Sequence, residues 1–455
     1  MSLLIKNARL NGEGLVDIKI KDEKIFQIGL DLGEEDCKIY DAKGRLTLPG
    51  GIDVHTHMAL DLGDFVAVDD FHTGTRAAAY GGTTTIVDHI AFGSKESFVD
   101  QMIDHYHDLA DGKAVIDYSF HGAIQDAREK TLDLIGSLHQ DQGLVSTKIY
   151  TTYGGKVDDK EILKILKKAK ETGTVVCVHC ENHGAIEELR AQAEKDGQGA
   201  PIYHAKTRPV ETEAEAINRL IYLSELAGFP KLYIVHTSSK LGLEEIKKAR
   251  ARGVKNLYCE TCTQYLTLTE DKYLEGGNEE GVKYIMAPPL RKTEDLEALW
   301  QGIEDGQVDV VATDHCPFFY QSEKLPYKDD FQKCPGGGPG VEERMEIILT
   351  EGLRRGISLE RLIEVLITNP AKIFGFYPKK GTIQIGSDGD LVIYDEKPYT
   401  ISQTNRHSNV DYTGYEGFKV DYKVASVISR GSFVLKDGEY LGRPGQGKFI
   451  KRSFK

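Results

Sequence analysis

The stretch LTLPGGIDVHTH (residues 46–57) decides the fold. It is an apolar run that ends in two histidines spaced two apart, and side chains two apart on a strand point the same way. Seven further apolar runs follow it, and several also end in a residue that can bind a metal ion. The further runs are TTTIVDHI (83–90), AVIDYSFHG (114–122), LVSTKIY (144–150), TVVCVHC (174–180), LYIVHTS (232–238), NLYCETC (256–262) and VDVVATDHC (308–316).

Helical patterns lie between these runs. In residues 158–173, Ile162, Ile165 and Leu166 recur at helical spacing, and a glycine closes the pattern. Residues 209–228 begin with a proline and end with a glycine, as helices often do. Eight strand–helix units predict an α/β fold, a (β/α)8 TIM barrel, whose active site lies at the carboxyl ends of the strands.

The two flanks of the chain have a different pattern. Residues 1–48 and 375–440 contain short alternating strands, such as VDIKIKDEKIFQIG and GDLVIYD, separated by turn residues. They predict one small β-sandwich domain, built from both termini, beside a metal-dependent hydrolase barrel of residues 49–374. Residues 441–455 are rich in glycine and then basic, and they predict a C-terminal arm that packs on a neighbouring subunit or, alternatively, a loose tail.

Composition excludes several classes of partner. The 455 residues carry a net charge of −14, which disfavours binding to nucleic acid or to an anionic membrane surface. No apolar run approaches the roughly 18 residues of a membrane span, and no signal peptide opens the chain. Seven cysteines without a secretory signal are typical of reduced thiols, so we expect a cytoplasmic protein.

The paired histidines of the first run are the first candidate metal ligands. At the end of the first barrel strand, His55 and His57 would both face the interior mouth, where two imidazoles suit a metal such as zinc. The alternative is a pair of hydrogen-bonded core histidines. A second pair, His105 and His107, lies in a helical pattern, where residues two apart diverge by about 200°. We therefore expect no metal there.

Lys148 is unusual because its strand is otherwise apolar. A buried ammonium group near a metal ion would be repelled. If burial lowers the pKa of Lys148, its neutral amine can add CO2, and the resulting carbamate can bridge two metal ions. The alternative is a lysine that extends to the rim. His179 and His236 follow the next two runs and could complete a second metal site. Asp314 could bind one metal ion and still reach a water molecule between the two.

These residues resemble the cyclic-amide branch of the amidohydrolase superfamily, the dihydropyrimidinase and hydantoinase family. The matching motifs span essentially the whole chain in the family's order. Three runs, DDFHTGTRAAAYGGTTTIVDH, VIDYSFHG and VDYTGYEGF, are closer to the phenylhydantoinase subgroup. The family motifs are PGGIDVHTH, GGTTTIVDH, TKIYTTY, VHCEN, RPVETEAEAI, VHTSS, ETCTQYL, APPLR, VATDHCPF and PGVEERM.

The resemblance implies a binuclear zinc centre and a mechanism. His55, His57 and Asp314 would hold one zinc ion. His179 and His236 would hold the other, with carbamylated (carboxylated) Lys148 as the bridge. A hydroxide bridging the two ions would attack the carbonyl of the ring, and Asp314 would take the hydroxide proton and pass it to the leaving nitrogen.

The resemblance also implies how the substrate is bound. Tyr153 would donate a hydrogen bond to the developing oxyanion. Backbone groups near Ala287 and Gly336 would bind the ring, at positions where the family commonly has Ser and Asn.

Loops after the first and fourth strands should shape the pocket for the exocyclic substituent. Leu60, Leu62 and Phe65 in the first loop predict an apolar pocket. Dihydroorotase-like relatives carry an Arg two residues after the second His, to bind a substrate carboxylate. This chain has Ala59 there, which favours a neutral ring.

The leading hypothesis is zinc-dependent hydrolytic ring opening of 5-substituted hydantoins or dihydropyrimidines to N-carbamoyl amino acids. The alternatives are an allantoinase and a non-catalytic, dihydropyrimidinase-like scaffold. The resemblance also implies a homotetramer. Two CxxC pairs, Cys177 with Cys180 and Cys259 with Cys262, resemble a zinc ribbon, but an offset of three places the thiols on opposite faces of a strand. We expect no structural zinc there.

Overall fold

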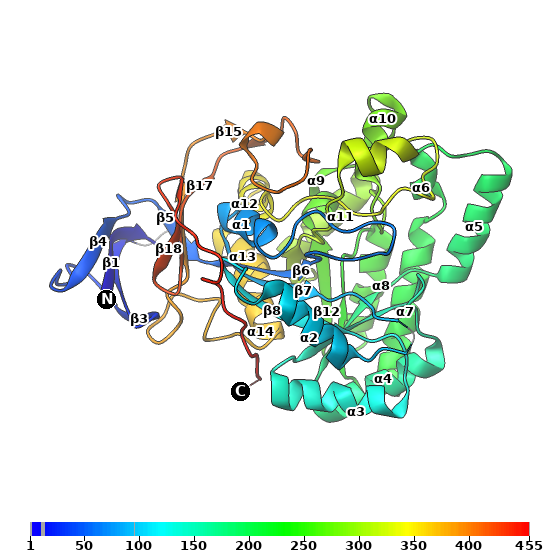
Figure 1. Ribbon diagram of the computed structural model, residues 1–455, viewed down its shortest axis with the longest axis horizontal. Coiled ribbons are helices and arrows are strands. Elements are labelled where there is room, and N and C mark those ends of the chain that lie inside the picture. The colour runs from blue at the N-terminus through cyan, green and yellow to red at the C-terminus, as the bar shows by residue number, and fades with distance from the viewer. Residues whose placement is uncertain (1, 11–13, 95, 455) are drawn as a thin grey trace.

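Eight parallel strands form the centre of the protein in a computed structural model that describes residues 2–10, 14–94 and 96–454 (Figure 1). Positions 1, 11–13, 95 and 455 of the predicted domain ranges lie outside the described residues. Each strand pairs with the next along the chain, and a bridge between Thr56 and His315 brings the last strand end to the first. The predicted barrel is confirmed. Its strands are β6 (Gly51–Thr56), β7 (Thr83–His89), β8 (Asp117–Ala123), β9 (Ser146–Tyr150), β10 (Val175–His179), β11 (Lys231–Ile234), β12 (Leu257–Cys262) and β13 (Val310–Ala312).

The first predicted run is two strands rather than one. β5 (Leu46–Pro49) pairs with strands of the other sheet, and β6 begins the barrel two residues later. Gly50 lies at the crossing, where a Cβ atom would overlap the side chain of Thr84. Only glycine fits this close approach, so the chain passes from one sheet to the other within one apolar segment.

Helices cover the outside of the barrel (Figure 1). The predicted helix at residues 158–173 is α4, in which the Asp158 side chain accepts a hydrogen bond from the backbone N–H of Glu161, and Gly173 ends the helix with φ 75°. The predicted helix at 209–228 is α7. The longer helices are α1 (Thr73–Tyr80), α2 (Val99–Ala110), α3 (Glu129–Ser137), α4 (Asp159–Thr172), α5 (His183–Lys195), α7 (Val210–Leu226), α8 (Lys240–Ala251), α11 (Thr293–Glu304) and α12 (Arg344–Arg354). The short ones are α6 (Ile202–Lys206), α9 (Thr263–Thr267), α10 (Gly277–Gly281), α13 (Leu359–Ile363) and α14 (Asn369–Ile373).

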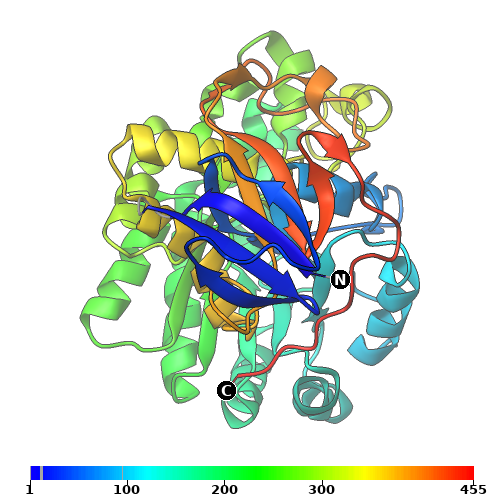
Figure 2. The ribbon, with the colours of Figure 1, turned by 90° about the vertical axis from the view of Figure 1, so that its left-hand side faces the viewer.

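A second, nine-stranded sheet combines the two ends of the chain (Figure 2). β14 pairs with β5 on one side and β17 on the other, so the sheet is continuous from N-terminal to C-terminal strands. Residues such as Ile5, Ile18 and Ile393 form its own small core, apart from the barrel core. The strands are β1 (Ser2–Arg9), β2 (Leu15–Lys21), β3 (Lys24–Gly29), β4 (Cys37–Asp41), β5, β14 (Leu391–Asp395), β17 (Lys423–Ser429), β18 (Ser432–Lys436) and β19 (Glu439–Tyr440), with a separate pair β15 (Tyr399–Thr400) and β16 (Lys419–Val420).

The C-terminal segment packs on its own barrel, so it is not the loose tail that the sequence left as an alternative, and its contact with a neighbouring subunit stays a prediction. Residues 448–450 exchange backbone hydrogen bonds with Tyr118 at the start of β8. Arg452 is buried and donates to Ser119, Ser146 and the carbonyl oxygen of Phe120. Apolar contact by Phe449 and these hydrogen bonds hold the segment against its own chain.

Among the residues that the structure describes, no helix combines the length and the hydropathy that a membrane span requires.

Candidate metal centre

The six predicted ligands come from five barrel strands and line one cavity of about 600 Å³. They lie in the strands or within two residues of their carboxyl ends, since parallel barrel strands all end at the same mouth. Two of them, His236 and Asp314, have φ angles of 39° and 55°, a backbone region that non-glycine residues rarely adopt. Such strained conformations cluster at functional sites, and they persist only where the surrounding structure stabilises them.

His55, His57 and Asp314 form the tighter half of the centre. Oδ1 of Asp314 lies 3.0 Å from Nε2 of His55 and 3.1 Å from Nε2 of His57. Three ligand atoms from these residues lie within 4.8 Å of one another, which is compatible with a single metal ion. The sequence prediction that both histidines face the same way is confirmed.

His179, His236 and Lys148 form the other half. The rings of His179 and His236 are 4.5 Å apart, and the ring of His236 stacks 5.4 Å from that of His55. Lys148 is only 1% exposed. Burial lowers the pKa of its amine, although the carboxylate of Asp314 opposes that shift. Lys148 therefore lines the cavity instead of extending to the rim.

Neighbouring carboxylates outweigh burial at His55 but not at His57. Burial alone would lower the pKa of His55, but Glu260 and Asp314 raise it to about 9. Burial would raise the pKa of Asp314, but His55 and His57 hold it well below its usual value. Burial lowers the pKa of His57 despite Asp314, so in this half only His55 favours positive charge beside the ionised Asp314.

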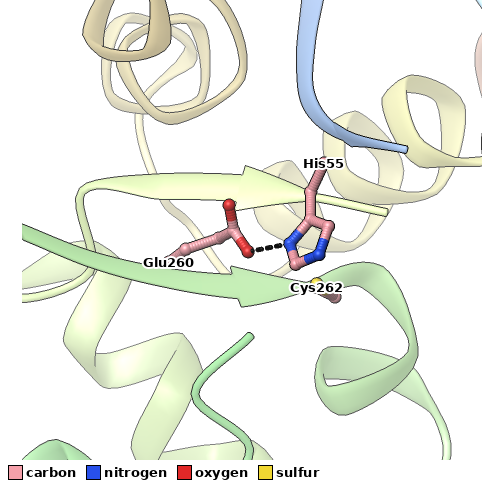
Figure 3. Close-up of side chains that lie close together, drawn as sticks. All are labelled: His55, Glu260 and Cys262. Atoms are coloured by element: carbon pink, nitrogen blue, oxygen red, sulfur yellow. Dashed lines mark hydrogen bonds and ion pairs between the residues drawn. The ribbon is translucent and has the colours of Figure 1, made fainter. Parts of the chain in front are cut away.

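Two buried carboxylates that support the ligands were missed in the sequence. Glu260 on β12 lies 2.6 Å from Nδ1 of His55 (Figure 3). Glu181 lies 2.7 Å from Nε2 of His179 and pairs with Arg208, which holds the pKa of Glu181 at about 2 against the effect of burial. The available signal was a glutamate at the end of each of two apolar runs, VVCVHCE and NLYCE.

His89 is a further missed residue at the centre. Its ring lies 4.3 Å from the ring of His55 and 4.2 Å from that of His121. Both of its nitrogens are buried and have no hydrogen-bond partner among the described residues. It is the last residue of β7, and the six candidate ligands also lie at or near strand ends, so the run TTTIVDH contained the signal.

The predicted substrate-binding residues line the same cavity. Tyr153, Ala287 and Gly336 are all in its wall. Tyr153 has φ 70°, and its ring lies 5.1 Å from the ring of His179. A Cβ atom at Gly336 would meet open space, so the absence of a side chain there widens the cavity.

The loop after β6 differs in part from the prediction. Leu60 and Leu62 line the cavity, as does the carboxylate-bearing Asp61. Phe65 instead anchors the loop, because its ring packs edge-on against Phe318 at 6.3 Å and Tyr327 at 5.9 Å. The pocket is therefore less apolar at its rim than the sequence predicts.

The other histidines near the motifs and the CxxC cysteines are not among the six candidate ligands. Nε2 of His315 pairs with Asp69 at 3.0 Å, so His315 faces away from the centre. His105 and His107 lie on α2, as predicted. The four cysteines of the CxxC pairs are buried free thiols, and among the described residues only Cys262 belongs to a group that could hold a metal ion, together with His55 and Glu260 (Figure 3).

Comparison with known proteins places this geometry in a family. The profile described as "Amidohydrolase family" matches residues 46–434. The chain belongs to the amidohydrolase family. Within it, the chain is 44% identical to the D-phenylhydantoinase of Escherichia coli O1:K1 / APEC, over 99% of this chain and 98% of that protein. The predicted resemblance to hydantoinases, and the prediction of a hydrolase, are confirmed.

Solved structures of a dihydropyrimidinase and of hydantoinases share the fold. The dihydropyrimidinase from Brevibacillus agri NCHU1002 superposes with a TM-score of 0.96 at 42% identity, covering 100% of this chain and 99% of that one. The D-hydantoinase from Bacillus sp. AR9 gives 0.96 at 42% identity, covering 99% of each chain. The L-hydantoinase from Arthrobacter aurescens gives 0.88 at 32% identity, covering 99% of each chain.

The residues present fit the metal that this amidohydrolase fold implies. Nδ1 of His57 and Nδ1 of His236 are buried and have no hydrogen-bond partner among the described residues. Glu260 and Glu181 each take one ring nitrogen of a candidate ligand, which leaves the other nitrogen of His55 and of His179 to bind a metal. Imidazole nitrogens with one carboxylate are a donor set that zinc prefers.

Proposed function

We propose that this amidohydrolase is a zinc-dependent cyclic amidase that opens 5-substituted hydantoins or dihydropyrimidines to N-carbamoyl amino acids. The observation that carries the proposal is the convergence of six ligand-type side chains, from five strands, on one cavity that also contains Tyr153. The names of the relatives, D-phenylhydantoinase, D-hydantoinase and dihydropyrimidinase, support this substrate class.

The proposed cofactor is a pair of zinc ions in each chain. His55, His57 and Asp314 would hold one ion, and His179 and His236 would hold the other. Lys148 would contact both ions as a carbamate, formed when its neutral amine attacks CO2, makes an N–C bond and releases one proton to leave the carbamate anion. Two zinc ions bound here would lower the pKa of water and polarise the substrate carbonyl.

The chain's own residues then carry the proton and stabilise the transition state. Asp314, ionised in this site, accepts the proton of the attacking water. As the ring C–N bond breaks, Asp314 passes that proton to the leaving nitrogen. The hydroxyl of Tyr153 donates a hydrogen bond to the oxyanion that develops on the attacked carbonyl. The backbone at Ala287 and Gly336 orients the ring.

The cavity wall supports a neutral substrate with an apolar substituent. Leu60, Leu62, Ile90 and Phe92 line it, together with glycines of the loop after β9. Ala59 leaves no cation at the position that dihydroorotase-like relatives use for a carboxylate. Dihydroorotate is therefore disfavoured, and an aryl or alkyl group at ring position five is favoured.

Location and assembly complete the proposal. All seven cysteines are free thiols in the described chain, which supports a reducing, cytoplasmic location. The C-terminal segment packs on its own barrel, so it gives no argument for assembly. The homotetramer is therefore proposed from the family resemblance alone. Analytical ultracentrifugation tests it, and a monomer would contradict it.

A substrate panel tests the function. Turnover of 5-phenylhydantoin, dihydrouracil and allantoin should show the highest kcat/KM for a hydantoin or dihydropyrimidine. A preference for allantoin would favour the allantoinase alternative. Chelation, or Lys148→Ala, should abolish turnover. Full activity of the metal-free protein would refute the proposal, and a purified chain with no bound zinc and no turnover would favour a scaffold.

A further inference from the structure

One buried carboxylate contacts both halves of the candidate metal centre. Glu260 lies on β12 and is 0% exposed. Its Oε1 accepts a hydrogen bond from Nδ1 of His55 at 2.6 Å and from the backbone N–H of His236 at 2.9 Å. Its Oε2 accepts from the hydroxyl of Tyr233 at 2.8 Å. Figure 3 shows the carboxylate directed at the ring of His55.

The contact with His55 fixes a ring orientation. In the neutral ring that a metal ligand requires, a proton on Nδ1, held by Glu260, leaves the lone pair of Nε2 free, and Nε2 is the atom that lies 3.0 Å from Asp314. A carboxylate that accepts from the distal nitrogen also makes the imidazole a stronger ligand. Glu260 therefore sets both the tautomer and the basicity of His55.

The contact with His236 fixes a backbone. His236 has φ 39°, which is unfavourable for a residue with a side chain. The hydrogen bond from its N–H to Oε1 of Glu260 is buried, so losing it would leave a buried donor unpaired. This bond holds His236 in the conformation that brings its ring 4.5 Å from that of His179.

We propose that Glu260 is a positioning residue that couples the two metal sites. The inference rests on the proposed function, in which His55 belongs to one site and His236 to the other. Because a single oxygen serves both residues, a change that moves one ligand also moves the other. Glu181 provides the contrast, since among the six candidate ligands its side chain contacts His179 alone.

The test compares how tightly three Glu→Gln variants hold zinc. Glu260→Gln removes the negative charge that both contacts share. Glu181→Gln changes a carboxylate at one site. Glu346→Gln is the matched control, because Glu346 is 3% exposed and accepts from a backbone N–H, that of Val424, and from the hydroxyl of Tyr399, but contacts none of the six ligands.

Each zinc-loaded protein is dialysed against a graded zinc chelator, and the zinc that remains per chain is measured by atomic emission. We expect Glu260→Gln to release both ions together, at a free zinc concentration about 10- to 100-fold higher than the wild type requires. Glu181→Gln should pass through a form with about one ion per chain, since it affects one site of the pair. Glu346→Gln should follow the wild type.

Two further measurements separate positioning from a structural role. Excess zinc should restore most of the turnover of Glu260→Gln, and the metal-free variant should melt close to the metal-free wild type. If Glu260→Gln does not fold, Tyr233→Phe removes only the bond to Oε2 and should shift zinc release in the same direction by a smaller factor.

The outcomes distinguish the two proposals. A wild type that binds no zinc contradicts the proposed function and, with it, the coupling. A wild type with both ions, together with a Glu260→Gln variant that retains zinc like Glu346→Gln or loses one ion alone, overturns only the role of Glu260.

Discussion

Tyr153→Phe tests the oxyanion contact with the smallest change of structure. The ring of Tyr153 packs against His179 at 5.1 Å, and the guanidinium of Arg208 lies 5.4 Å from the ring centre. Phenylalanine keeps both ring contacts and loses only the hydroxyl. The variant should therefore bind the same metal ions and fold normally, while the transition state loses one hydrogen-bond donor.

The size of the effect follows from the exposure of Tyr153. Loss of an oxyanion donor costs about 10²- to 10³-fold in kcat. Because Tyr153 is 37% exposed, a water molecule can replace part of the lost hydrogen bond, which places the expected loss near the lower end. We expect kcat to fall about 100-fold, equivalent to about 2.7 kcal/mol, with little change in KM.

Steady-state kinetics with 5-phenylhydantoin provide the assay. Tyr150→Phe is the matched control, because Tyr150 lines the same cavity and its ring also lies near His179, at 5.8 Å. Zinc content must be equal in all three proteins. A loss of less than about threefold in Tyr153→Phe, which is under 1 kcal/mol, would refute the reasoning. An equal loss in Tyr150→Phe would also refute it.

Three other predictions concern pH, packing and specificity. Burial raises the pKa of Glu346 to about 7, so the folded state binds its proton more tightly than the unfolded state, and its contribution to stability is lost as pH rises from about 4.5 to 7. In urea unfolding, the free energy of unfolding of Glu346→Gln minus that of the wild type should be larger at pH 8 than at pH 5, by at most about 3 kcal/mol. An equal difference at both pH values would contradict this. Gly50→Ala forces a Cβ atom into Thr84 and should cost about 2 to 3 kcal/mol of unfolding free energy. Gly33→Ala, whose Cβ atom meets no other atom, should cost under about 1 kcal/mol. Similar losses in the two variants would contradict the conclusion that only glycine fits between β5 and β6. Asp61→Asn should raise kcat/KM for hydantoins with a carboxylate substituent and leave kcat/KM for 5-phenylhydantoin unchanged, because the Asp61 charge lines the cavity. The increase should be only about two- to fivefold, because Asp61 is exposed and its charge is screened by solvent. Equal changes for both substrates would exclude a charge effect.

Local patterns determined the barrel and most of the ligand set. Alternating apolar runs and capped helices are encoded within about 20 residues, so α4 and the eight barrel strands could be predicted from neighbours in the chain. Parallel strands end at one mouth, so His55, His179 and Asp314 could be brought together from position alone. Lys148 stood out because its amine contrasts with an apolar strand.

Contacts between distant residues were decided only by the tertiary structure. Glu260 lies 205 positions from His55, and their hydrogen bond depends on how β12 packs across from β6. The division of the first run at Gly50, the rotation of Phe65 out of the cavity and the burial of Arg452 likewise depend on which surfaces meet. Sequence periodicity specifies which face of a strand or helix is apolar, but it does not specify which other element packs against that face. The sequence by itself therefore determined the barrel and the identity of the candidate ligands, whereas the folded chain decided which carboxylates hold those ligands in place.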